Sequence, residues 1–152
     1  MTDIEILLAC LILYHEDLMS VEEYKEILNK EFIQNTDNEL LLEREWNISD
    51  MRESILLVRN YCTEHREIFD DTVFGKFLFK KLKAVFEQEN PDIRYFGGVM
   101  YRLWETLPPW LQDREAFYSL SYADDPLSWG DEEQTRKLYE EAFKFYDKNH
   151  TL

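Results

Sequence analysis

Residues 101–133 read YRLWETLPPWLQDREAFYSLSYADDPLSWGDEE and hold three of the four tryptophans and three of the four prolines. Large aromatic side chains bury about 150–250 Å² each, and proline fixes the backbone φ angle. Aromatic anchors joined by rigid turns fix how neighbouring helices meet. We therefore predict that this stretch is the structural centre of the fold. Trp104, which follows Leu103 and lies one helical turn after Met100, is expected to be buried.

The composition favours a helical protein. The chain has 152 residues, of which 45% are hydrophobic, and it contains only four glycines and four prolines. A chain of this length suits one domain with a sizeable core, and all-β proteins normally need many turns built from glycine and proline. We therefore predict a single acidic helical domain, residues 1–152, of the all-α class.

Periodic apolar positions predict a bundle of about six or seven helices. The first helix has a stripe that includes Ile4, Leu7, Leu8 and Leu11, wide enough to be covered on more than one side. A short helix is also expected after Pro109. Serine and aspartate favour the N-cap position, and the predicted caps of the other helices are Ser20, Ser49, one of residues 70–72, Asp92 and Ser128.

Two segments leave alternatives open. Residues 39–47, ELLLEREWN, are too short to separate helix from strand, so a short helix is preferred and a short hairpin is the alternative. The pair Gly97-Gly98 lies inside a helical pattern, where each glycine costs about 1 kcal/mol relative to alanine. The pair therefore predicts either the close approach of another helix or a break.

The charge of the chain narrows the choice of partners. The net charge is −15, with −10 in residues 1–50, zero in residues 51–100 and −5 in residues 101–152. Such a field repels nucleic-acid phosphates and anionic lipid headgroups, and it attracts basic proteins. We therefore expect a basic protein partner, no binding to nucleic acid and no binding to membranes. The alternative is that the acidity serves solubility alone.

The cysteines and the N-terminal residues point to a cytoplasmic protein. Cys10 and Cys62 each lie among apolar residues, which predicts two buried free thiols. The apolar run of residues 6–13 is too short to span a bilayer. It is also preceded by Asp3 and Glu5, where a signal peptide needs positive charge. We expect a buried helix and a cytoplasmic location.

Motifs for catalysis and for metal binding are missing from the sequence. It contains no His-Glu-x-x-His, no Gly-x-Ser-x-Gly, no phosphate-binding loop and no metal-type cysteine spacing. His15, Glu16 and Asp17 are adjacent, so on a helix they diverge and are better explained as a polar helix end. The acidic residues 124–133 do not fit the ligand positions of an EF-hand. No catalytic residue, metal or cofactor is therefore predicted.

Exposed tyrosines beside carboxylates predict a binding surface, since tyrosine anchors partners and acidic residues steer basic ones. The candidate partner-binding residues are Tyr118, Tyr122, Asp124, Asp125, Trp129, Asp131, Glu132 and Glu133. The leading hypothesis is a non-enzymatic acidic protein that binds a basic partner, such as an immunity protein or an inhibitor of a toxin or nuclease.

Two other hypotheses stay open. The first is an enzyme whose carboxylates and histidines, with His15, His65 or Asp124 as candidates, come together only in the fold. The second is a structural helical subunit that forms a homo-oligomer.

Overall fold

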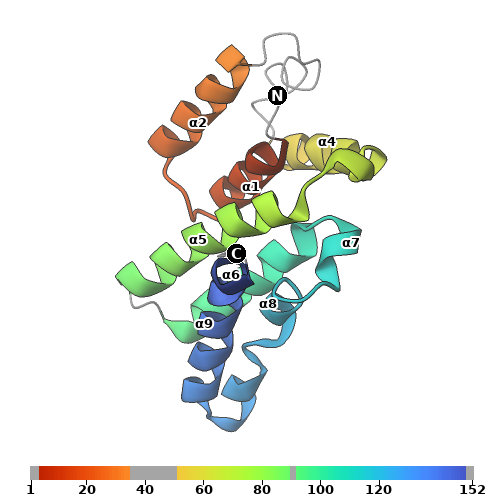
Figure 1. The fold of residues 1–152 in the computed structure, drawn as a ribbon. Coiled ribbons are helices and arrows are strands. Elements are labelled where there is room, and N and C mark those ends of the chain that lie inside the picture. Colours follow the sequence, from red (N-terminus) through yellow and green to blue (C-terminus); the bar gives the residue numbers. More distant parts are fainter. Residues whose placement is uncertain (1–3, 35–50, 90–91, 150–152) are drawn as a thin grey trace. The chain divides into compact units, whose positions relative to one another are not determined.

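The structure is a computed structural model that describes residues 4–34, 51–89 and 92–149. These residues form eight α-helices and two 3-10 helices and include no β-strand (Figure 1), which confirms the predicted all-α class. Residues 39–47, with their predicted helix or hairpin, lie outside the described ranges. The helices are α1 Ile4–His15, α2 Val21–Gln34, α4 Met51–Glu64, η1 Arg66–Ile68, α5 Asp71–Glu89, α6 Ile93–Thr106, α7 Pro109–Gln112, α8 Ser119–Tyr122, η2 Asp125–Trp129 and α9 Glu132–Asn149.

Residue contacts divide the chain into two compact units, Met1–Phe74 and Gly75–Leu152, with the boundary inside α5. The single domain predicted from the length therefore stays a prediction, and each unit is described by itself below. None of the described helices combines the length and the apolar character that crossing a bilayer requires.

Helix α1 forms the core of the first unit. Nine of its residues between Ile4 and Leu13 are buried, and the helix packs against α2 and α4. Tyr14 of α1 stacks on Tyr24 of α2, with ring centroids 4.4 Å apart. This burial agrees with the wide apolar stripe predicted for the first helix. Cys10 and Cys62 are both buried and free, as expected.

The end of α1 explains the cluster of His15, Glu16 and Asp17. The backbone N–H of Leu18 donates to the carbonyl of Leu13 at 2.8 Å, and that of Asp17 donates to Tyr14 at 3.1 Å. Asp17 has a left-handed backbone, with φ 59°. These two bonds and the left-handed residue form a Schellman motif, so the cluster is the polar helix end that the sequence predicted.

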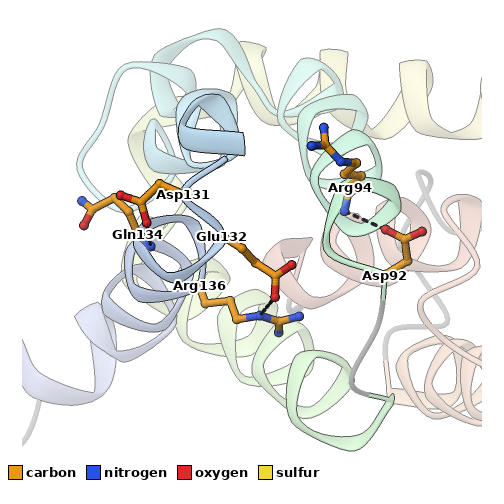
Figure 2. A network of polar contacts seen from close by, with 6 residues as sticks. All are labelled: Asp92, Arg94, Asp131, Glu132, Gln134 and Arg136. Carbon is orange, nitrogen blue, oxygen red and sulfur yellow. Dashed lines mark hydrogen bonds and ion pairs between the residues drawn. The ribbon is translucent and has the colours of Figure 1, made fainter. Parts of the chain in front are cut away.

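Three of the predicted N-caps are confirmed by hydrogen bonds. The Ser20 hydroxyl accepts from the backbone N–H of residue 23 at 3.1 Å. The Asp70 carboxylate accepts from the N–H groups of residues 72 and 73 at 3.0 and 3.2 Å. The Asp92 carboxylate accepts from the N–H of Arg94 at 2.9 Å (Figure 2). Each bond satisfies a donor that the first turn of a helix leaves unpaired.

The predicted cap of the last helix is wrong. Ser128 lies inside η2, and the carboxylate of Asp131 instead accepts from the N–H of Gln134 at 3.0 Å. The reason is Gly130, whose φ of 78° ends η2 and redirects the chain before α9 begins. Ser49, the remaining predicted cap, lies outside the described residues.

The second unit has an aromatic core. The ring of Phe79 lies 5.1 Å from Phe117, 5.9 Å from Tyr146 and 6.3 Å from Phe143, measured between centroids. Phe117 comes from the stretch predicted to be the structural centre, and it is fully buried together with Leu107, Leu111 and Leu120. Phenylalanine and leucine, not the tryptophans, therefore anchor that stretch.

Trp104 is only half-buried, so its predicted burial is wrong. Its indole N–H donates to the carbonyl of Gln112 at 2.9 Å, and the Gln112 amide donates back to the carbonyl of Trp104 at 3.1 Å. A tryptophan N–H needs a hydrogen-bond partner, which this site supplies at the edge of the core. The fully buried positions of α6 are taken by Met100 and Leu103.

Gly97 and Gly98 lie in one unbroken helix, α6, but in different surroundings. A Cβ on Gly97 would stand 2.7 Å from the Cβ of Asp124, whereas a Cβ on Gly98 would meet nothing nearer than Arg102 Nη1 at 3.8 Å. A break is therefore excluded. Close approach is confirmed for Gly97, but the neighbour is Asp124 in the turn between α8 and η2 and not another helix.

The two glycines provide a matched pair of substitutions. We expect Gly97→Ala to lower the free energy of unfolding by about 1–3 kcal/mol, because the added methyl overpacks the site. Gly98→Ala should raise it by about 0.5–1 kcal/mol, because alanine is the better helix former and has room. Urea denaturation of both variants measures the difference. Equal stabilisation by both would show that Gly97 is not packed against Asp124.

Candidate functional site

An open groove lies between α8 and α9 in the second unit, with a volume of about 420 Å³. These two helices contact each other (Figure 1). Three of its lining side chains are aromatic, three are carboxylates and four are small or aliphatic. They are Tyr118, Tyr122 and Phe145; Asp113, Glu115 and Glu141; and Ala116, Ser119, Leu138 and Ala142.

Helical periodicity places the tyrosines of α8 and the groove residues of α9. Tyr118 and Tyr122 are four residues apart across α8, so their rings meet on one side, with centroids 5.3 Å apart and planes inclined by 50°. Leu138, Glu141 and Phe145 recur at spacings of three and four on one face of α9. The tyrosine side chains remain 50% and 36% exposed respectively. The groove therefore presents aromatic surface to solvent.

Ala116 lies in the turn between α7 and α8. Its φ is 73°, a left-handed conformation that favours glycine, and the residue is buried. The left-handed conformation costs alanine roughly 1–2 kcal/mol. Such a conformation persists only where the surrounding packing compensates for the cost. The burial of Ala116 is consistent with such packing.

The groove is acidic. Asp113, Glu115 and Glu141 line it, and neither a lysine nor an arginine is among its described lining residues. Arg114 and Lys137 are neighbours in sequence but do not line the groove. Carboxylates that line one groove create a negative local potential, which attracts a cationic group and steers its approach.

The structure separates the predicted binding residues into two groups. Tyr118 and Tyr122 line the groove, whereas Asp124, Asp125 and Trp129 do not. Asp124 is half-buried against Gly97, and Trp129, on η2, is 68% exposed.

The two aspartates act on a buried tyrosine of α9. Burial raises the pKa of Tyr139, and the carboxylates of Asp124 and Asp125 raise it further. Tyr139 is therefore a neutral phenol at physiological pH.

The remaining predicted residues lie at the start of α9. Asp131 caps the helix, and Glu132 pairs with Arg136 at 3.0 Å between Oε2 and Nε (Figure 2). Glu133 is exposed in the first turn. Acidic residues there stabilise the helix through its dipole, which gives all three a structural role. A role in partner binding stays a prediction for these residues.

Only Tyr118 and Tyr122 of the ten described lining residues were predicted from the sequence. The charged and aromatic residues that were missed are Asp113, Glu115, Glu141 and Phe145. The spacing of residues 138, 141, 142 and 145 is a helical signal that predicts a second face of the last helix. The contributions of Asp113 and Glu115 had no such signal, because an irregular turn sets their direction.

The candidate residues of the enzyme hypothesis, His15, His65 and Asp124, are not among the described residues that line the groove. The groove lining contains neither histidine nor cysteine, and no described group of three histidine, cysteine, aspartate or glutamate side chains could hold a metal ion. The His65 ring stacks on Tyr61, with centroids 4.2 Å apart. Burial, and to a lesser extent the Glu5 carboxylate, raise the pKa of the Cys62 thiol to about 12, so it is not an activated nucleophile.

No family model matches the sequence, and no curated protein or solved structure is significantly similar to it.

Proposed function

We propose that this protein is a non-enzymatic binding protein that engages a basic protein partner through the groove between α8 and α9. The observation that carries the proposal is the combination of two exposed tyrosines with three carboxylates in one concave site, with neither lysine nor arginine among the lining residues that the structure describes. Tyrosine is enriched at the energetic centres of interfaces, and complementary charge accelerates association.

The net charge of −15 supports the same proposal at longer range. Exposed charges act over about 8 Å at physiological salt, so an acidic surface around the groove guides a basic protein before contact. An immunity protein or an inhibitor of a basic toxin or nuclease is the specific form of this proposal. In that case the bound partner should lose its activity in proportion to the fraction that is complexed.

Salt dependence of the binding kinetics tests the proposal. A partner captured from the native organism should associate about 10-fold or more slowly when the salt concentration rises from about 0.05 to 0.5 M, while dissociation changes less. Glu115→Lys should slow association further. The matched control is Glu64→Lys, which reverses one exposed charge on α4 in the first unit.

An association rate that does not depend on salt and is equal for Glu115→Lys and the original protein would contradict the proposal. The acidity would then serve solubility alone. The hypothesis of a structural subunit has its own measurement: light scattering would give the mass of a stable homo-oligomer for the purified chain.

A further inference from the structure

We propose that the groove binds an arginine side chain of the basic partner, placed against the rings of Tyr118 and Tyr122 and between the flanking carboxylates. The inference rests on the proposed function and specifies the chemistry of its contact. The first support is the ring pair. The two rings lie 5.3 Å apart and are tilted by 50° to each other, and both tyrosines are partly exposed where they line the groove. The face of an aromatic ring attracts a cation that lies within about 6 Å of its centre.

The carboxylates favour guanidinium over ammonium. Asp113 and Glu115 come from the segment before α8, and Glu141 comes from α9. Guanidinium carries five N–H donors in a plane that stacks on aromatic rings and pairs with carboxylates, and it is weakly hydrated. The ammonium of lysine is compact and strongly hydrated, so it should bind the two tyrosine rings and the carboxylates less tightly than guanidinium does.

Size and competition within the chain also support the inference. A volume of about 420 Å³ lies in the range of ligand pockets and can hold one long side chain with part of its backbone. The smaller cavity beside α9, about 220 Å³, has Lys83 and Lys144 next to Glu87 and Glu140. That cavity therefore has both charges in its lining, whereas neither lysine nor arginine is among the described residues that line the groove.

Calorimetric titration of the full chain with synthetic peptides tests the inference. The probe is a ten-residue peptide in which arginine alternates with serine, and the matched control replaces arginine by citrulline, which has the same shape without the charge. A third peptide carries lysine. We expect the arginine peptide to bind, the lysine peptide to bind about 3- to 10-fold more weakly, and the citrulline peptide to bind about 30-fold more weakly or not at all.

Substitutions in the groove then locate the contact. The double variant Tyr118→Leu with Tyr122→Leu should weaken arginine-peptide binding about 10- to 30-fold, whereas the double phenylalanine variant keeps both rings and should stay within about threefold. Glu141→Gln should weaken it about 3- to 10-fold. Glu140→Gln makes the same charge change on another face of α9 and should have an effect below about twofold. Thermal melts identify any variant that fails to fold.

The outcomes separate this inference from the proposed function. Equal binding by the double leucine and the double phenylalanine variants, or by the arginine and citrulline peptides, would overturn the inference. Failure of the arginine peptide to bind at concentrations up to about 1 mM would overturn it as well. In each case a salt-dependent association with the captured partner would still support the proposed function.

Discussion

Replacement of Phe79 by alanine is expected to lower the free energy of unfolding by about 3–5 kcal/mol. The Phe79 side chain is 0% exposed, and its ring packs against Phe117, Phe143 and Tyr146. Truncation removes the transfer free energy of the ring and leaves a cavity that its aromatic neighbours only partly fill. A loss of this size is a large fraction of the stability of a typical domain. Urea denaturation followed by circular dichroism measures it.

Phe77, two residues earlier in α5, provides the control. It is half-buried, and the Lys81 ammonium lies 5.6 Å from its ring centroid. Phe77→Ala should therefore cost about 1–2 kcal/mol, since less apolar surface returns to water. Equal costs for the two phenylalanines would contradict the aromatic core described for residues 75–149.

The Phe79 variant also tests the prediction of a single domain. If the whole chain unfolds as one cooperative domain, circular dichroism and tryptophan fluorescence should show one coincident transition at lower urea. A curve with two steps, of which the substitution shifts only one, would instead assign the two compact units to separate domains.

The second large effect is expected at Glu5. This residue of α1 is only 6% exposed, and its carboxylate accepts a hydrogen bond from the backbone N–H of Asp70 at 2.7 Å. Glu5→Ala should lower the free energy of unfolding by about 2–3 kcal/mol, because it removes a charge-assisted bond and leaves a part-buried N–H without that acceptor. Denaturant melts measure the loss.

Two comparisons isolate the cause. Glu5→Gln keeps an oxygen acceptor of similar shape, so it should cost only about half as much. Glu64→Ala removes an exposed carboxylate at the end of α4 and should change the stability by less than about 0.5 kcal/mol. If Glu5→Ala proved as mild as Glu64→Ala, the bond to Asp70 would contribute nothing measurable to the fold.

The sequence by itself determined the helical class, the starts of three described helices and the acidic character. These features depend on local rules: apolar residues recur with the period of a helix, and Ser20, Asp70 and Asp92 cap the helices that follow them. The same rules explain why the wide apolar stripe of α1 was read correctly. Where a local rule had two readings, as at Gly97 and Gly98, the sequence left both open.

Only the tertiary structure decided which side chains meet. The groove joins residues 113–122 to one face of α9, and the direction of Asp113 and Glu115 depends on a turn with a left-handed Ala116. The bond between Glu5 and Asp70 spans 65 positions in the chain. Local periodicity cannot encode such pairings, because they depend on how whole helices pack. Packing likewise left Trp104 half-buried and brought Tyr118 and Tyr122 together with carboxylates that the sequence had not grouped with them.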